Sequence, residues 1–210
     1  KNLCLAGGVA LNCVSNGKLL REGPFDNLWI QPAAGDAGGA LGVALLIWYE
    51  YLGKDRIAEE AKVMQKASYL GNHYEDKEIE EFLVKEGAPF VKLKTEEIPS
   101  RIAELIADEN VIGWFEGRME FGPRSLGSRS IIGDPRSKEM QSIMNVKIKY
   151  RESFRPFAPS VLREHVSDYF DINCESPYML LVANLKDEKK IKMSGEEEKL
   201  FGLAKLKVVR

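Results

Sequence analysis

Apolar residues in the first fifty positions alternate between short runs, typical of strands, and spacings of three and four, typical of helices. Glycine and proline residues between these segments predict turns. The predicted elements are a strand at 2–6, a turn at Gly7 and Gly8, a helix at 9–20 ended by Gly23 and Pro24, a strand at 28–31, a turn at 32–35 and a helix from Asp36. Two strand–helix units in succession predict an α/β fold.

Beyond residue 50 the pattern first becomes charged and then alternates again. The charged stretch from Tyr51 to Lys66 predicts a helical connector, and we place a domain boundary in it, between residues 62 and 63. The elements predicted after it are helices at 76–85 and 99–108, strands at 89–93, 111–115 and 179–183, a loop-rich stretch at 117–159 and an exposed loop at 187–198. In the second of these helices we expect Ile102, Leu105 and Ile106 to face inward.

Composition is that of a globular protein. Of the 210 residues 44% are hydrophobic, and the net charge of −2 provides no general attraction to nucleic acid or membranes. The longest apolar run, Leu41–Trp48, is too short to span a membrane. Because Cys4, Cys13 and Cys174 cannot all pair and form no CxxC motif, we expect a reducing, cytoplasmic compartment. The chain begins at Lys1 and enters an apolar strand at once, so we expect it to be a piece of a longer protein.

Two glycine-rich turns follow the predicted strands, and both lead into helices. Gly7, Gly8 and Asn12 belong to the first turn. Such a turn can bring the free N–H groups of a helix N-terminus close to a phosphate, but a plain turn that needs a positive φ angle explains the glycines equally well. In the second turn Asp36 is either the N-cap of its helix or a metal or nucleotide ligand, and Gly38 permits close approach to the helix.

The stretch from Arg118 to Pro159 is rich in arginine. It holds nine Lys or Arg residues against four Asp or Glu residues, in a chain that is net negative. Planar guanidinium groups suit phosphate oxygens, and the interleaved Gly and Pro residues fix them on defined loops. We therefore predict an anion site rather than a solvated basic surface, and nucleic-acid binding fits less well because the cations lie in turns. The cations assigned to this site are Arg118, Arg124, Arg129, Arg136, Lys149, Arg151 and Arg155.

Two local arrangements are expected within this stretch. The glycine turn between Arg124 and Arg129 is expected to bring their guanidinium groups together. Arg151 and Arg155 flank Phe154, whose ring can be buried while both guanidinium groups reach one cavity.

Four motifs together resemble a known family. They read GGVALN, QPAAGDAGGALG, GRMEFGPRSLGSRSIIGDPR and KYRESFRPFAPSVL. This set closely resembles the carbamoyltransferases of antibiotic biosynthesis and nodulation-factor modification. The resemblance implies that residues 1–62 are the C-terminal part of an actin-like, sugar-kinase-like ATPase domain (ASKHA type). Residues 63–210 would then be a truncated C-terminal domain of α/β type, similar to the carbamoyl-adenylate-forming domains of tRNA modification.

The resemblance also implies a two-step reaction. Carbamoyl phosphate and ATP first give carbamoyl-adenylate, with release of phosphate and pyrophosphate, and the carbamoyl group then passes to a small-molecule hydroxyl. The implied cofactors are ATP with Mg²⁺, and Fe²⁺ held by Asp36 and by two histidines that this sequence lacks. The implied catalytic residues are Arg124, Arg129 and Arg155, and the implied cofactor-binding residues are Gly7, Gly8, Asn12, Gly38, Arg118, Arg136, Lys149 and Arg151.

Alternatives to this interpretation stay open. A carbamoyl-type transferase of tRNA modification or hydrogenase maturation would carry similar motifs, and a non-catalytic nucleotide-binding module would bind ATP without carbamoyl phosphate. His73 and His165 match no zinc spacing and are expected to be surface or packing residues. We expect no nucleic-acid or membrane partner, a homodimer is compatible with the sequence, and the piece alone is expected to be inactive.

Overall fold

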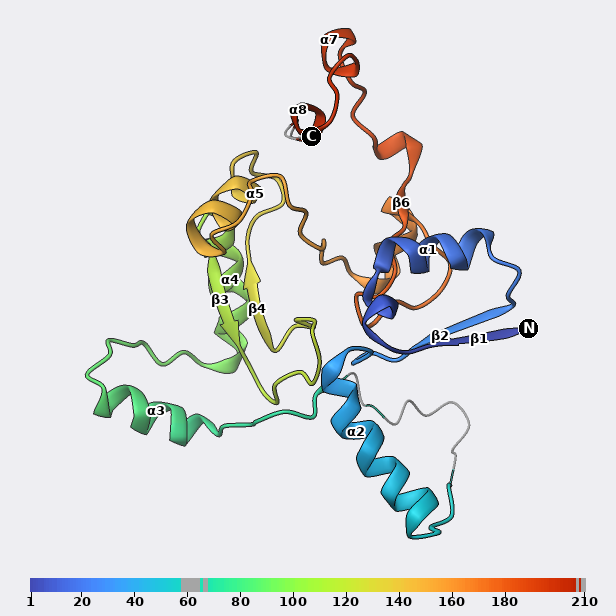
Figure 1. Cartoon of the computed structure of the whole chain (residues 1–210). Coiled ribbons are helices and arrows are strands. Elements are labelled where there is room, and N and C mark those ends of the chain that lie inside the picture. Colours follow the sequence, from blue (N-terminus) through green and yellow to red (C-terminus); the bar gives the residue numbers. More distant parts are fainter. Residues whose placement is uncertain (58–64, 66–67, 207, 209–210) are drawn as a thin grey trace. The chain divides into compact units, whose positions relative to one another are not determined.

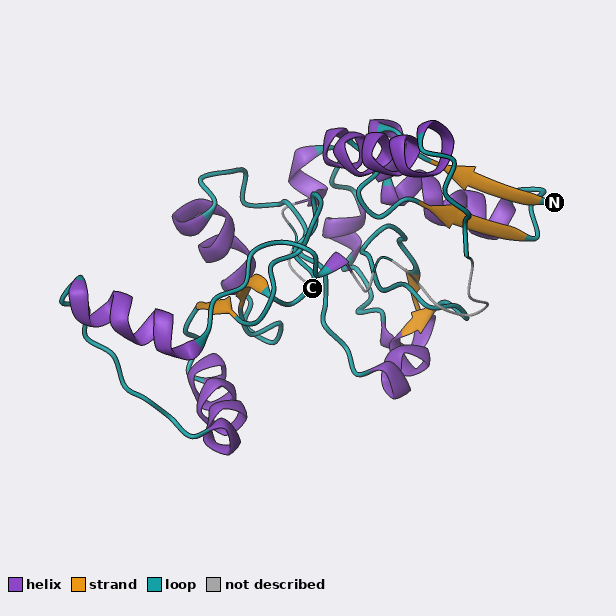
Figure 2. Cartoon of the chain, turned by 90° about the horizontal axis from the view of Figure 1, so that it is seen from below, coloured by secondary structure: helices purple, strands orange, loops and turns teal. Residues whose placement is uncertain are grey.

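A computed structural model describes residues 1–57, 65, 68–206 and 208 (Figure 1). The chain forms two compact units. The first unit comprises residues 1–87, 115–130 and 174–183, and the second comprises residues 88–114, 131–173 and 184–210. Helices and short two-stranded sheets occur along the chain, with loops between most of them (Figure 2), so the predicted α/β class is confirmed.

The first unit begins with a parallel pair of strands. β1 (Asn2–Leu5) runs beside β2 (Asn27–Ile30), with Asn2 opposite Asn27 and Leu5 opposite Ile30. Both strands alternate between exposed and partly buried residues, as expected when one face of a sheet is covered. Both predicted strands are therefore confirmed.

The helix predicted at 9–20 is interrupted at Asn12. A 3₁₀ turn (Gly8–Leu11) precedes the break, and α1 (Cys13–Glu22) follows it. The Asn12 side chain accepts a hydrogen bond from the Ser15 N–H at 3.1 Å, which makes Asn12 the N-cap of α1. The helix ends immediately before Gly23, as predicted.

The strand predicted at 179–183 does not form. The carbonyl of Leu180 accepts from the buried Asn16 amide at 3.0 Å, and that of Val182 accepts from Arg21 at 2.9 Å, so α1 takes acceptors that a neighbouring strand would need. Gly17 permits this close approach, since a Cβ there would lie 2.3 Å from the Val182 oxygen. The segment is therefore a loop that side chains of α1 hold by hydrogen bonds.

The helix predicted from Asp36 is α2 (Asp36–Leu46), which continues as a π-helical turn (Ile47–Tyr51). Its N-cap is Gly35, so the interpretation of Asp36 as the N-cap is wrong and Asp36 is the first helical residue. No residue of α2 is buried. The predicted helical connector is wrong for residues 52–57, which are not helical. Residues 58–64, with the boundary placed between 62 and 63, and residue 66 lie outside the described residues.

The predicted helices in the middle of the chain are confirmed. They are α3 (Asp76–Lys85) and α4 (Ile98–Ala107), the latter with a 3₁₀ turn (Thr95–Glu97) before it. Ile102, Leu105 and Ile106 of α4 are half-buried, as expected. The strand predicted at 89–93 is absent, because none of the described strands pairs with this segment and a strand needs a partner ladder.

β3 (Ile112–Phe115) was predicted, whereas its partner β4 (Arg129–Ile132) lies in the stretch predicted as loop. The remaining elements are α5 (Met140–Ile143) with a π-helical turn (Met144–Ile148), a 3₁₀ turn (Arg163–His165), α6 (Val166–Tyr169), β5 (Phe170–Asp171) antiparallel to β6 (Asn184–Leu185), a 3₁₀ turn (Asp187–Lys189), α7 (Gly195–Glu198) and α8 (Leu203–Leu206). None of the helices in the described ranges combines the length and the apolar character needed to cross a bilayer.

Candidate functional site

The two glycine-rich turns of the first unit meet at the carboxyl ends of β1 and β2. The N–H of Gly7 donates to the carbonyl of Ala34 at 2.8 Å, and Gly7 has a φ of +93°. Gly38 faces the turn closely, because a Cβ there would lie 2.0 Å from the Ala33 oxygen. The close approach predicted at Gly38 is thus made by the protein's own backbone, and Asp36 beside it is exposed.

Arg124 reaches this same place within the first unit. Its Nη2 donates to the carbonyl of Leu11 at 2.9 Å, directly before Asn12. Its Nε is buried and has no hydrogen-bond partner in the described part of the chain. Gly122, with a φ of +129°, belongs to the loop at 117–128, called the arginine loop from here on. It lets this loop pack on the turn that contains Ala33, since a Cβ at Gly122 would lie 3.3 Å from that of Ala33. The arginine loop and the glycine-rich strand ends therefore form one packed region.

A buried carboxylate closes the arginine loop. Oε1 of Glu120, which is 8% exposed, accepts from the backbone N–H groups of Leu126 (2.6 Å), Ser128 (2.9 Å) and Arg129 (3.3 Å). Burial alone would raise the pKa of Glu120, but these backbone donors outweigh it and the pKa is lowered. Glu120 is therefore held ionised at the base of the loop.

Arg129 is bound within the first unit and does not share an acceptor with Arg124. Its Nη1 donates to the carbonyl of Glu116 at 2.8 Å, and its Nη2 donates to that of Gly117 at 3.1 Å. Its guanidinium also stacks 3.5 Å from the centroid of the Phe115 ring. Arg124 and Arg129 thus donate to different backbone carbonyls. The expectation that the glycine turn brings their guanidinium groups together stays a prediction.

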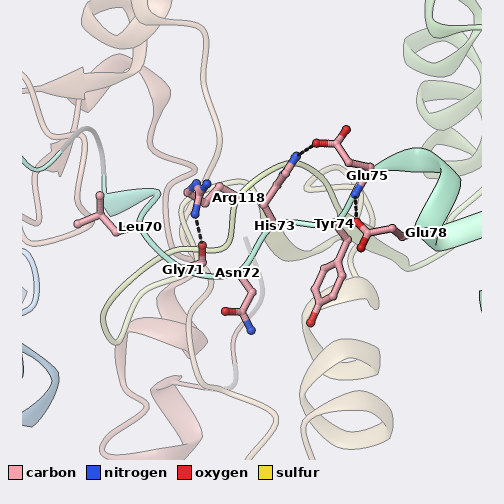
Figure 3. A pocket seen from close by; sticks show the side chains of 8 residues that line it. All are labelled: Leu70, Gly71, Asn72, His73, Tyr74, Glu75, Glu78 and Arg118. Atoms are coloured by element: carbon pink, nitrogen blue, oxygen red, sulfur yellow. Dashed lines mark hydrogen bonds and ion pairs between the residues drawn. The ribbon is translucent and has the colours of Figure 1, made fainter.

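Arg118 borders an open pocket of about 550 Å³ in the first unit (Figure 3). Its Nη1 donates to the carbonyl of Gly71 at 2.9 Å. His73 also lines the pocket, with Nε2 3.0 Å from Oε1 of Glu75, and is partly exposed, as expected for a surface residue. Figure 3 shows the Tyr74 ring directed away from the His73–Glu75 pair, so the polar side chains do not converge on one point. The other lining residues are Leu70, Asn72 and Glu78.

In the second unit, Arg136 is paired with a buried carboxylate. Its Nε lies 2.9 Å from Oδ1 of Asp134, and its Nη2 lies 2.7 Å from Oδ2. The Arg136 guanidinium and its backbone N–H lower the pKa of Asp134, against the opposing effect of burial. One edge of this guanidinium is therefore already occupied by a protein acceptor.

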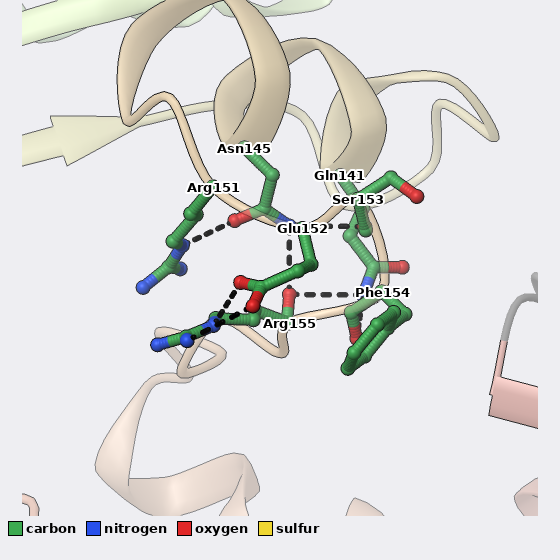
Figure 4. Close-up of polar contacts among 7 residues, drawn as sticks. All are labelled: Gln141, Asn145, Arg151, Glu152, Ser153, Phe154 and Arg155. Carbon is green, nitrogen blue, oxygen red and sulfur yellow. Dashed lines mark hydrogen bonds and ion pairs between the residues drawn. The ribbon is translucent and has the colours of Figure 1, made fainter. Parts of the chain in front are cut away.

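Arg151 and Arg155 lie on a loop of the second unit that two helical amides hold (Figure 4). Asn145 Oδ1 accepts from Nε of Arg151 at 2.5 Å, and Nε of Arg155 donates to Oε2 of Glu152 at 2.7 Å. In Figure 4 both guanidinium groups extend from the same side of the loop, and the Phe154 ring lies on the other side. The expectation that both guanidinium groups reach one cavity stays a prediction. The remaining predicted cation, Lys149, is exposed.

No group of three or more His, Cys, Asp or Glu residues that could hold a metal ion occurs among the described residues. Asp36 can therefore supply one carboxylate ligand but not a whole site from this part of the chain.

Two family models match the sequence. The model of the carbamoyltransferase N-terminus matches residues 1–45, and the model of the carbamoyltransferase C-terminus matches residues 103–197. The chain belongs to the carbamoyltransferase family. The glycine-rich turns lie in the first match, and the arginine block (residues 118–159) lies in the second. The interval between the matches contains the boundary placed between 62 and 63, which stays a prediction.

Relatives support the same assignment. The chain is 56% identical over its whole length to an uncharacterised protein of Synechocystis sp., of which it covers 34%. It is 42% identical over its whole length to nodulation protein NolNO of Sinorhizobium fredii, covering 30% of that protein. It is 41% identical over 99% of its length to nodulation protein NolO of Bradyrhizobium diazoefficiens, covering 37% of that protein. The chain thus spans about one third of the length of these curated relatives.

Three residues that hold the arginine-bearing loops received no role from the sequence. They are Glu120, Gln141 and Asn145. One signal was available for Glu120, which is the single acid between Gly117 and Gly133, a segment rich in Arg and Gly residues. Gln141 and Asn145 are four residues apart, a spacing that places both on one helix face.

Proposed function

We propose that the chain is part of an ATP-dependent O-carbamoyltransferase. In this proposal carbamoyl phosphate and ATP give carbamoyl-adenylate, and the carbamoyl group then moves to the hydroxyl of a small molecule. Family membership supports the carbamoyl transfer, and the cations of the arginine block support the use of two phosphate-bearing substrates.

The proposal rests on the way in which the protein holds the Arg151 side chain. Its Nε is anchored on Asn145, and its guanidinium carbon lies 4.9 Å from the centroid of the Phe157 ring. No described residue accepts a hydrogen bond from its two Nη groups. A guanidinium that is fixed by the protein and still has free donors is suited to bind phosphate oxygens at two points. Arg155, on the same side of the loop, would add a second positive charge once an anion displaces Glu152.

The proposed first step balances with one water consumed. Carbamoyl phosphate loses its phosphate, ATP loses pyrophosphate, and a new bond joins the carbamate oxygen to the α-phosphorus. Both leaving groups are polyanions, so fixed cations that stabilise the developing charge would accelerate the step. Arg151 and Arg155 would bind the phosphate oxygens of the leaving groups. Arg136 would contribute positive charge only, because its Nε and Nη2 are already paired with Asp134.

Metal ions enter the proposal at two points. Mg²⁺ would accompany the ATP phosphates, and Asp36 would supply one ligand to the Fe²⁺ site implied by the family resemblance. Asp36 fits as a partial ligand, because its carboxylate is exposed at a strand end and has no hydrogen-bond partner among the described residues. A bound metal would polarise the group transferred, and Asp36 would fix its position.

The test is pyrophosphate–ATP exchange by the full-length protein that carries this sequence. We expect exchange only when carbamoyl phosphate is present, and we expect Arg151→Ala to reduce it by at least about tenfold, the size of one lost hydrogen bond to a charged group. Arg101→Ala is the matched control, since Arg101 forms only an exposed pair with Glu104. Exchange that needs no carbamoyl phosphate, or equal exchange by Arg151→Ala and wild type, would contradict the proposal.

A further inference from the structure

Asn145 holds the loop that carries Arg151 and Arg155 in two ways. It is 0% exposed, and its Nδ2 donates to the carbonyls of Ser153 at 3.0 Å and Arg155 at 2.8 Å. Its Oδ1 accepts from Nε of Arg151 at 2.5 Å, and its backbone carbonyl accepts from the Arg151 N–H at 3.0 Å. One buried amide therefore fixes both the main chain of the loop and the side chain of its arginine (Figure 4).

The helix that presents Asn145 is irregular at this point. Asn145 lies in the π-helical turn Met144–Ile148 that continues α5, and such turns are rare and are frequently found at functional sites. One turn earlier, Gln141 donates to the carbonyls of Phe154 at 3.3 Å and Arg155 at 3.1 Å. Gln141 contacts only the main chain of the loop, whereas Asn145 also contacts an arginine side chain.

An amide suits this position because it donates and accepts hydrogen bonds at the same time. A carboxylate would accept from Arg151 but would face the carbonyl oxygens of Ser153 and Arg155 without a proton to donate. An aliphatic side chain would leave these groups without a partner in a buried place. An arginine held in advance also loses less conformational freedom when it binds an anion than a mobile one does.

We propose that Asn145 is a positioning residue for the anion site and acts through Arg151 rather than by touching the anion. The inference rests on the proposed function for the identity of that anion, a phosphate-bearing substrate. If it is correct, the contribution of Asn145 to phosphate binding exists only while Arg151 is present.

A double-mutant cycle in the full-length protein tests this, with inorganic phosphate titrated by calorimetry into wild type, Asn145→Ser, Arg151→Ala and the double variant. We expect each single substitution to weaken phosphate binding about tenfold, and the double variant to bind no more weakly than Arg151→Ala. Asn145→Asp, of the same shape, repeats the cycle if the serine variant does not fold. Gln141→Leu is the control for loss of main-chain contacts alone and is expected to weaken binding less than Asn145→Ser.

The outcomes separate the two ideas. If substitution of Asn145 weakens binding by the same factor with and without Arg151, or leaves it unchanged, Asn145 has no positioning role. If Arg151→Ala binds phosphate like wild type, the anion site of the proposed function is wrong at this loop. If Arg151→Ala weakens binding while both Asn145 variants bind like wild type, the proposed function stands and the inference alone is overturned.

Discussion

The Asp134 carboxylate and the Arg136 guanidinium meet at two points, although one side chain is 6% exposed and the other 74% exposed. The buried acid thus fixes an arginine that lies at the surface. The backbone N–H of Arg136 also donates to Oδ1 of Asp134 at 2.8 Å, so the acid holds the turn as well as the cation.

This pair should make stability sensitive to acid. The folded-state pKa of Asp134 is lowered by Arg136, whereas an unfolded aspartate titrates near about 3.9. The stabilisation is therefore complete above that pH and is lost as the pH falls through the lowered folded pKa. We expect the urea midpoint of wild type to fall more steeply below about pH 4 than that of Asp134→Asn. Asp55→Asn, at an exposed position, should keep the wild-type slope; equal slopes in all three proteins would contradict the prediction.

The Glu120 carboxylate should be important for the stability of the first unit. Glu120→Gln removes the charge from a group that accepts three backbone hydrogen bonds, and we expect a loss of about 1–3 kcal/mol in the free energy of unfolding. Glu81→Gln removes a carboxylate from an exposed pair with Lys77 and should change this free energy by less than about 1 kcal/mol. Chemical denaturation of both variants measures the difference, and similar small losses would show that the loop holds without Glu120.

Phosphate should raise the melting temperature of the protein by binding to the folded state, and the gain should shrink with added salt. We expect Arg155→Ala to lose most of this gain, because its guanidinium extends from the same side of the loop as that of Arg151. Arg124→Ala should instead lower the melting temperature without ligand, since its Nη2 is bound to Leu11. Thermal unfolding at several phosphate concentrations distinguishes the two, and loss of the gain in Arg124→Ala would restore the role predicted for Arg124 from sequence.

Asp36 should matter for one step of the proposed reaction only. In the full-length protein we expect Asp36→Asn to abolish carbamoyl transfer and to leave pyrophosphate–ATP exchange close to wild type, because the carboxylate lies in the glycine-rich region and not on the Arg151 loop. Separate assays of exchange and of transfer measure the two effects. Equal loss of both activities would argue against this division of labour.

Local signals predicted much of the fold. The helix at 76–85 and the end of α1 before Gly23 were found because capping groups and helix breakers are local in sequence. The strands expected at 89–93 and 179–183 failed because a strand depends on distant partners. At 180 and 182 those partners proved to be the side chains of Asn16 and Arg21.

The candidate site was predictable in its residue types but not in its contacts. An excess of arginine on Gly and Pro turns indicated anion binding. The spacing of residues in the sequence could not show that Arg124 and Arg129 are bound to separate carbonyls. The hydrogen bonds that Glu120 accepts and that Asn145 donates span six to ten residues across folded loops, and they depend on the tertiary structure.

The hydrogen bonds by which Gln141 and Asn145 hold the Arg151 loop have a consequence for sequence divergence. These bonds end on the main-chain carbonyls of residues 153, 154 and 155, which every amino acid carries. Replacement of Ser153 therefore leaves the acceptors in place, whereas replacement of Gln141 or Asn145 removes donors for which the loop has no substitute. As such proteins diverge, the freedom of this loop to vary is set by two amides that lie outside it.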